Sequence, residues 1–258
     1  MISRNQILRK EVARLTKDWM EIKNKTEESA DLYFYGDIVS SEWSAWEQTD
    51  QYPDNIKNFL DEVKDKPNLN IYINSGGGSV FGGIAIYNML KRHKAHKTVH
   101  VDGLAASIAS VIAMAGDKLI IPSNAFLMIH SPWVGAQGNA KDLRKMADDL
   151  DVMEQGILNI YQENLKEGVD IETIKEMVHA ETWMDGNEAS QYFNIEVAEE
   201  NKMAASASKY LDEYKNTPKN LTEKKVEEPK VETIPEIDNV ENSIDEELEL
   251  LALELDLL

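Results

Sequence analysis

Residues 97–122 read KTVHVDGLAASIASVIAMAGDKLIIP and carry the clearest fold signal in the chain. The first part, 97–103, is rich in β-branched residues and predicts a strand. The segment 107–116 is apolar on all sides and favours a buried helix, and 118–122 predicts a second strand. A strand, a helix and a strand in immediate succession are typical of an α/β domain.

The same alternation continues on both sides of this stretch. Strands are predicted at 32–38, 69–75 and 125–130, and helices at 54–64, 79–93 and 140–165. In the last of these helices the apolar residues recur on one face, namely Leu143, Met146, Leu150, Met153, Ile157 and Ile160. The predicted fold class is therefore a layered, strand-rich α/β domain.

The composition excludes several chemistries and partners. The chain has 258 residues, no cysteine and a formal net charge of −20, so thiol nucleophiles and thiolate metal sites are not available. The negative charge argues against nucleic acid and anionic membranes as partners, because both bind clustered lysine and arginine. The charged start lacks a signal-peptide core, and the apolar run 104–115 is shorter than the about 20 residues of a membrane span. We expect a cytoplasmic protein.

Changes in composition divide the chain into three parts. Residues 1–30 predict a charged helix, 31–202 the α/β domain, and 203–258 a polar linker that ends in an acidic amphipathic helix. From 226 to 258 there are twelve acidic residues and a single lysine. The apolar stripe of the terminal helix comprises Ile244, Leu248, Leu251, Leu255 and Leu258. This helix either packs back on the domain or docks on a partner, and its pattern leaves both open.

Ser107 is the candidate nucleophile. It follows a predicted strand and a short run that includes two alanines, at the start of a predicted helix, so its hydroxyl should lie at an exposed turn beside free helical N–H groups. On this segment alone, the alternative that Ser107 is only a helix cap is favoured, because serine is a preferred cap. Ser110 lies one turn later and should face the interior.

Gly76, Gly77 and Gly78 lie between a predicted strand and a predicted helix. Such a loop can cradle phosphate, supply a backbone donor for an oxyanion, or form a plain tight turn. No Lys-Ser or Lys-Thr pair follows, which disfavours a phosphate-binding loop.

The histidines offer one candidate base and no metal site. His93 and His96 lie in a basic, apparently solvated helix end without a third ligand. His100 alternates along a strand, and His179 lies on an exposed helix. His130 closes the strand AFLMI just before Ser131, a position where functional side chains gather, although a structural histidine is the alternative.

Four blocks together resemble the ClpP serine peptidase family, and especially its phage-encoded branch. They are NSGGGSVFGGIAIYNML, GLAASIASVIAMAG, FLMIHSP and ETWMDGNEASQYF, in the family's order and at similar intervals between about residues 31 and 197. The resemblance implies the ClpP/crotonase fold of repeated strand-strand-helix units. It also implies hydrolysis of peptide bonds in extended chains, with no metal or organic cofactor.

The resemblance also implies roles for particular residues. It places the nucleophile on Ser107, the general base on His130 and the oxyanion donors on the N–H groups of Gly77 and Ile108. The third triad member falls on Glu181, where the family usually has Asp, with Asp185 as the fallback and Asp142 third. Gly76 is a second departure, since the family commonly has Pro there. Backbone pairing with substrate is expected at Gly78, Ser79, Val80, Trp133 and Val134.

As a general base His130 must be neutral, with a pKa near about 6.5 that is raised if Glu181 stabilises the charged ring. Family members form stacked rings, so we expect a homo-oligomer, with the helix 140–165 as the joining element. The phage branch implies capsid or scaffold proteins as substrates and, for a phage-encoded enzyme, the host cytoplasm as location. The alternatives are a housekeeping degradative peptidase with an ATPase, a crotonase-type enzyme acting on thioesters, and a non-catalytic assembly protein.

Overall fold

The structure is a computed structural model that describes residues 25–45, 49–200, 208–218 and 221. Residues 1–24 of the predicted N-terminal helix and the predicted terminal helix, 244–258, lie outside the described residues and stay untested. The predicted end of the first helix, 25–30, is not helical, because β1 already begins at Ser29. The chain divides into two units at residue 222, and the second, 223–258, also lies outside the described part.

The described residues form one seven-stranded sheet with the order β1-β2-β3-β4-β7, in which β5 pairs with β3 and with β6. All neighbouring strands are parallel except β5 and β6. The strands are β1 Ser29–Tyr35, β2 Asn68–Ser75, β3 His96–Ala106, β4 Lys118–Pro122, β5 Phe126–Ile129, β6 Thr182–Asp185 and β7 Glu196–Ala198. Together with the helices below, this is the layered α/β class predicted from the sequence, and it is consistent with the ClpP fold.

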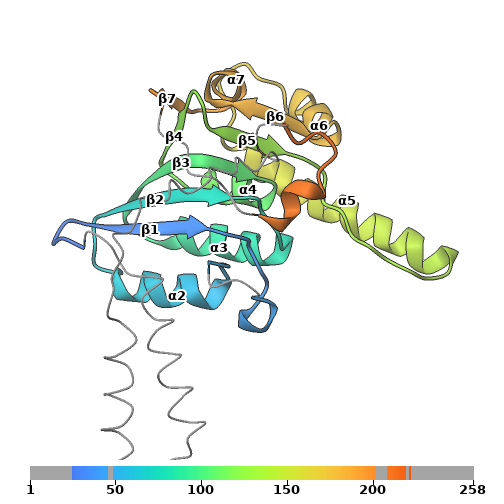
Figure 1. Ribbon diagram of the computed structural model, residues 1–258, viewed down its shortest axis with the longest axis horizontal. Coiled ribbons are helices and arrows are strands. Elements are labelled where there is room, and N and C mark those ends of the chain that lie inside the picture. The colour runs from blue at the N-terminus through green and yellow to red at the C-terminus, as the bar shows by residue number, and fades with distance from the viewer. Residues whose placement is uncertain (1–24, 46–48, 201–207, 219–220, 222–258) are drawn as a thin grey trace, which may run out of the picture. The chain divides into compact units, whose positions relative to one another are not determined.

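Helices lie between these strands, and Figure 1 shows α2 and α3 running along the same side of β1 and β2. Their bounds are α2 Pro53–Glu62, α3 Val80–Arg92, α4 Ile108–Ala113, α5 Ala140–Gln162, α6 Ile171–His179 and α7 Gly186–Tyr192, with 3-10 turns η2 Glu42–Ser44 and η3 Lys209–Asp212. None of the helices in the described ranges combines the length and apolar character needed to cross a bilayer.

Strand β3 is longer than predicted and changes its partner midway. Residues 98–100 pair with β4, whereas residues 104–106 pair with β5. The prediction ended this strand at residue 103 because Gly103 and the small residues after it suggested a turn. The ladder to β5 instead keeps Leu104, Ala105 and Ala106 extended up to Ser107.

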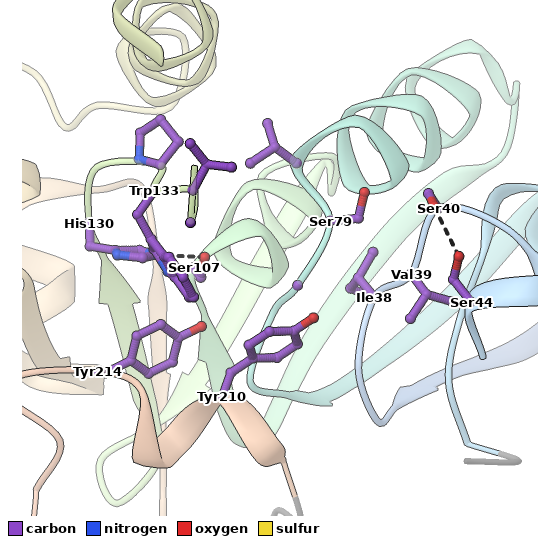
Figure 2. Close-up of a pocket in the computed structure, with 15 residues that line it drawn as sticks. Ile38, Val39, Ser40, Ser44, Ser79, Ser107, His130, Trp133, Tyr210 and Tyr214 are labelled. Carbon is purple, nitrogen blue, oxygen red and sulfur yellow. Dashed lines mark hydrogen bonds between the residues drawn. The ribbon is translucent and has the colours of Figure 1, made fainter. Parts of the chain in front are cut away.

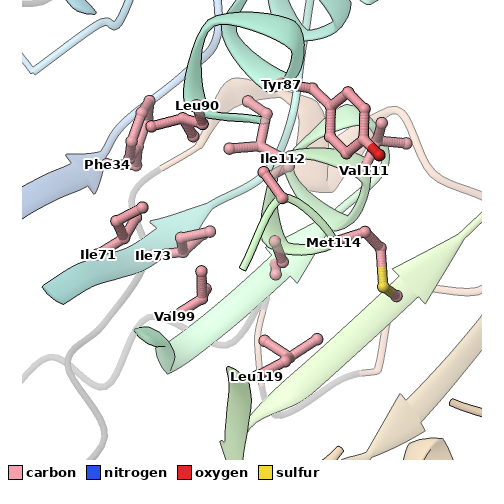
Figure 3. Close-up of a cluster of buried hydrophobic side chains, with 14 of the residues drawn as sticks. Phe34, Ile71, Ile73, Tyr87, Leu90, Val99, Val111, Ile112, Met114 and Leu119 are labelled. Carbon is pink, nitrogen blue, oxygen red and sulfur yellow. The ribbon is translucent and has the colours of Figure 1, made fainter. Parts of the chain in front are cut away.

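The core lies between the sheet and the helices on that side, as Figure 3 shows. In β1 the alternate residues Ala30, Leu32 and Phe34 are buried, which is the two-residue period of a strand with one face on the core. Helix α4 is buried along its whole length, and this explains why its sequence lacks a polar face.

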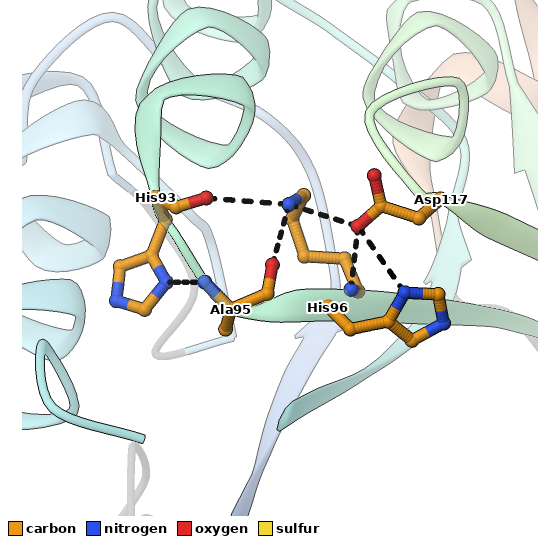
Figure 4. Close-up of polar contacts among 5 residues, drawn as sticks. His93, Ala95, His96 and Asp117 are labelled. Carbon is orange, nitrogen blue, oxygen red and sulfur yellow. Dashed lines mark hydrogen bonds and ion pairs between the residues drawn. The ribbon is translucent and has the colours of Figure 1, made fainter. Parts of the chain in front are cut away.

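A buried lysine lies at the start of β3, and Figure 4 labels three of the residues around it, His93, Ala95 and Asp117. Lys97 donates to the carbonyl oxygens of His93 and Ala95 at 3.3 and 2.7 Å, and its Nζ lies 3.0 Å from Asp117 Oδ2. Its side chain is only 5% exposed. The prediction of a solvated basic helix end is therefore wrong for Lys97, whose ammonium binds the carbonyl of His93, the C-cap of α3, and that of Ala95 in the loop after it.

Helix α5 begins at Ala140 as predicted, and in Figure 1 it projects from the domain. Only its last turns are buried, at Ile157, Leu158 and Tyr161. Leu143 and Met146, on the predicted apolar face, are 45% and 36% exposed. The apolar face thus covers the domain at one end and is open at the other.

Residues 208–218, which we call the strap, pack on the domain although the sequence predicted a linker from residue 203. Leu211 and Tyr214 are buried in a cluster with Leu104, Ala106 and Met128. These partners lie on the ends of β3 and β5. The prediction of a polar linker is wrong for the strap.

Candidate active site

Ser107 lies at the junction of β3 and α4 in a strained conformation. Its φ of 55° is in the left-handed region that residues with a side chain rarely adopt. It takes the N-cap position of α4, but its side chain makes no capping hydrogen bond. Instead its Oγ lies 2.7 Å from His130 Nε2. The plain helix-cap alternative therefore does not describe this serine.

Strand register brings His130 to this point. The ends of β3 and β5 run parallel, with Ala106 opposite Met128, and the Ser107 N–H donates to the Met128 carbonyl at 2.9 Å. His130 follows β5 directly, so both side chains emerge at the same edge of the sheet. Burial lowers the pKa of His130 below 6.5, and the negative charge of Glu181 opposes this only in part. The expected upward displacement of the pKa is therefore wrong in direction.

Glu181 lies beside His130 because β6 pairs antiparallel with β5, with Thr182 opposite Ile129. Its carboxylate accepts from the N–H groups of Lys215 and Asn216 at 3.0 and 2.6 Å. Among the described residues no hydrogen bond joins it to His130. The expected third triad member is thus near the base and bonded to the strap.

The two fallback acids have structural partners. Asp185 caps α7 by accepting from Glu188 N at 2.8 Å, at the far end of β6. Asp142 accepts from Asn139 N at 3.2 Å in the capping box of α5, on the exposed part of that helix. Both acids therefore stabilise helix starts, and neither is brought to His130.

Gly76, Gly77 and Gly78 form a loop, called the glycine loop below, that lies against the turn carrying Ser107. A Cβ on Gly77 would lie 2.7 Å from Ser107 Cβ, and one on Gly78 would lie 2.1 Å from the Ile38 carbonyl oxygen, so only glycine fits at either place. The Gly77 N–H donates to Ser75 Oγ at 3.2 Å. This contact weighs against Gly77 as an oxyanion donor, and Gly78 is the glycine of the two that lines the pocket.

A pocket of about 450 Å³ opens beside Ser107 and His130 (Figure 2). All five expected substrate-binding residues, Gly78, Ser79, Val80, Trp133 and Val134, line it. Trp133 and Val134 are 54% and 47% exposed, so apolar surface is available there to a bound chain.

Two further lining residues, Tyr210 and Tyr214, escaped the sequence reasoning. Both come from the strap, and Figure 2 shows them below Ser107 and His130. The ring of Tyr214 meets the His130 ring edge-on, with centroids 5.1 Å apart. Burial raises the pKa of Tyr214, and a side-chain hydrogen bond with Ser107 lowers it in part. The available signal was the spacing of Tyr210, Leu211 and Tyr214 in an otherwise polar segment.

Ser110 is fully buried, as predicted, and supports the turn from below. Its Oγ donates to the Ser107 carbonyl at 2.5 Å and lies 2.7 Å from the Tyr161 hydroxyl on α5. Because a serine hydroxyl has one proton, Tyr161 must be the donor to Ser110. The turn that carries Ser107 is therefore linked through these two hydrogen bonds to the buried end of α5.

The chain is similar to proteins of known class. A family model described as Clp protease matches residues 39–198. The ATP-dependent Clp protease proteolytic subunit of Ligilactobacillus salivarius is 36% identical over 147 residues, which cover 56% of this chain and 73% of that relative. A protein of the same description from Bacteroides fragilis, strain ATCC 25285, is 32% identical over 141 residues, 54% of this chain and 67% of the relative.

Proposed function

The chain belongs to the Clp protease family and is a serine peptidase, and we propose that Ser107 is its nucleophile and His130 its general base. The observation that carries this assignment is the 2.7 Å contact between Ser107 Oγ and His130 Nε2 at the wall of the pocket. The lowered pKa of His130 also supports it, because a base must be neutral at the working pH.

In the proposed reaction, His130 takes the Ser107 proton while the hydroxyl oxygen attacks the scissile carbonyl. The imidazolium then protonates the leaving amine, and water releases the acyl group by the reverse sequence. We assign the oxyanion donors to the N–H groups of Gly78 and Ile108. Gly78 faces the pocket and Ile108 is the first helical residue of α4, whose N–H has no acceptor inside the helix.

The substrate in this proposal is an extended chain that pairs with backbone at 78–80 and 133–135, the two segments that flank the pocket. Glu181 is assigned an electrostatic role, since its charge favours the imidazolium that forms during attack.

A fluorophosphonate probe and a peptide substrate test the assignment. The full chain should be labelled once, on Ser107, and Ser107→Ala should lose labelling together with hydrolysis, by on the order of 10⁴-fold or more. Ser190→Ala, on α7 and not among the residues that line the pocket, is the control, because it removes a serine hydroxyl and leaves the turn that carries Ser107 unchanged. Labelling or turnover of Ser107→Ala at the wild-type level would refute the assignment.

For assembly we propose a homo-oligomer of stacked rings joined through α5. The support is the projecting part of this helix, which exposes Leu143 and Met146 on the predicted apolar face, by 45% and 36%. Exposed apolar side chains that share one helix face are typical of a protein interface.

For the natural substrate we propose capsid or scaffold proteins processed during phage head maturation. The support is the block resemblance to the phage-encoded branch and the acidic extension beyond residue 222. The test is incubation of the full chain with capsid and scaffold proteins encoded beside it, with Ser107→Ala as the control. Specific cleavage without ATP favours maturation, whereas degradation that needs an ATPase favours the housekeeping alternative.

A further inference from the structure

Besides the hydrogen bond of Tyr214 with Ser107, the strap contacts three groups of the candidate active site. The first is the glycine loop, where the Tyr214 hydroxyl donates to the Gly76 carbonyl at 2.5 Å. Ser208, the first residue of the strap, anchors it through a 2.6 Å hydrogen bond to Asp37. A Cβ on Gly76 would lie 2.1 Å from Ser208 Oγ, so the strap can sit here only because residue 76 has no side chain.

The second contact is with Glu181, whose two carboxylate oxygens accept from Lys215 N and Asn216 N. The side chain of Asn216 also donates to the carbonyls of Ala180 and Glu181, at 2.9 and 3.1 Å. Glu181 itself has a left-handed φ of 51°. Four hydrogen bonds from the strap thus hold an otherwise unfavourable backbone conformation.

The third contact is with the base. Tyr214 is 8% exposed and packs between the rings of His130 and Trp183, with centroids 5.1 and 6.0 Å away. Edge-on packing of this kind fixes the plane of a ring, and the plane of the His130 ring decides whether Nε2 points at Ser107.

Gly76 and Glu181, the two positions at which the sequence departs from the ClpP pattern, both touch the strap. A proline at 76 would place ring atoms where Ser208 lies. An aspartate at 181 would be one methylene shorter, and its oxygens would retreat from the N–H groups of Lys215 and Asn216. Both departures are therefore explained by a single element.

We propose that the strap is a working part of the active site, in which Tyr214 and the amides of Lys215 and Asn216 are positioning groups for the Gly76–Gly78 loop, His130 and Glu181. The proposal rests on the proposed function of Ser107 and His130. It requires that removal of these contacts slows the chemical step while the pocket still binds substrate.

Tyr214→Phe in the full chain removes one oxygen and keeps the ring. We expect kcat to fall by about tenfold with KM changed by less than about twofold, since a small misplacement of catalytic groups costs rate more than binding. Tyr192→Phe, at the end of α7 and away from the pocket, is the matched control and should keep the wild-type kcat.

Gly76→Ala provides an independent test with a built-in rescue. The added methyl group should displace Ser208 and lower kcat by about tenfold or more. Ser208→Gly in the same chain should restore part of it by making room, up to the kcat of Ser208→Gly alone, which lacks the hydrogen bond to Asp37 and is the reference. If the strap only stabilised the fold, these variants would differ in melting temperature, and Ser208→Gly would not restore kcat. If Gly76→Ala does not fold, Tyr214→Phe decides alone.

Wild-type kcat in both single variants would overturn the proposal. A kcat above wild type would also overturn it, because the strap would then be an inhibitory cover. Fluorophosphonate labelling of the unaltered chain separates these failures from failure of the proposed function. A chain that is labelled on Ser107 and active, but indifferent to the strap variants, refutes the positioning role only.

Discussion

The phenol oxygen of Tyr161 lies 2.7 Å from Ser110 Oγ, and through this contact helix α5 reaches the turn that carries Ser107. Both residues are buried, with Tyr161 1% and Ser110 0% exposed. A buried hydroxyl that loses its partner is costly, whereas a pair removed together is not.

The free energies of unfolding of the single and double variants should reveal the coupling between Tyr161 and Ser110. Tyr161→Phe should lower the free energy of unfolding by about 1 kcal/mol, because Ser110 keeps its bond to the Ser107 carbonyl. Ser110→Ala should cost about 2 kcal/mol, since it leaves the Tyr161 hydroxyl buried without an acceptor. Urea denaturation of both variants and of the double variant is the measurement. Strictly additive losses would contradict the coupling.

The pH dependence of kcat/KM should report His130. Its neutral form is the base and burial lowers its pKa, so activity should rise with pH through one ionisation below 6.5 and be level above it. Glu181→Gln removes the charge that raises this pKa, and the midpoint should move to still lower pH. A wild-type midpoint above 6.5, measured between about pH 4.5 and 8 on folded enzyme, would contradict the assignment.

Asp117→Ala should destabilise the fold through Lys97, which would remain buried without its counter-charge. Asp117 is itself 41% exposed and screened by water, so we expect a loss of about 2 kcal/mol, less than the about 3–5 kcal/mol of a fully buried pair. Replacement of Lys97 by Met in the same chain should recover part of the loss. Chemical denaturation of wild type, Asp117→Ala and the double variant is the measurement. A free energy of unfolding of Asp117→Ala equal to that of wild type would show that the ion pair does not stabilise the fold.

The same pair predicts a loss of stability in acid. Burial raises the pKa of Asp117, but hydrogen bonds and charge from Lys97 outweigh it and hold the pKa below 3.8. A depressed carboxyl pKa stabilises the fold above the unfolded value and ceases to do so as pH falls through the folded value. The stability difference between wild type and Asp117→Ala should therefore shrink below about pH 4. A difference that stays constant to pH 2 would exclude this explanation.

Assembly should depend on the exposed part of α5. Leu143→Asp combined with Met146→Asp places charges on its open apolar face and should shift the protein to smaller species in light scattering. Val197→Asp, on β7, changes an apolar residue of similar exposure and is the matched control. If wild type, the Leu143→Asp/Met146→Asp variant and Val197→Asp all had the same mass in light scattering, α5 would not join the subunits.

Much of the fold was predictable from local patterns. The helix α4 and the strand β4 follow from an apolar run and a β-branched run separated by Gly116 and Asp117, and the structure has both within a few residues of the prediction. The proximity of Ser107 and His130 was also accessible, because each ends a strand of one parallel sheet.

The strap was not predictable in this way. Its residues are polar by composition, and Tyr214 is buried only because β3, β5 and Trp183 build a surface that receives it. The proposed assignment of the oxyanion donor to Gly78 in place of Gly77 was out of reach of the sequence for a related reason. Adjacent N–H groups point in different directions, and only the hydrogen bond from Gly77 to Ser75 Oγ shows which one is already used.

The order in which the chain is synthesised gives the strap a further consequence. Ser107, His130 and Glu181 all precede it, so a ribosome completes them before the groups that hold Glu181 and the Gly76 carbonyl exist. A nascent chain that ends before Asn216 has its nucleophile and base without the clamp around them. The full rate of hydrolysis would then require translation of the strap, after Ser107, His130 and Glu181 have already been made.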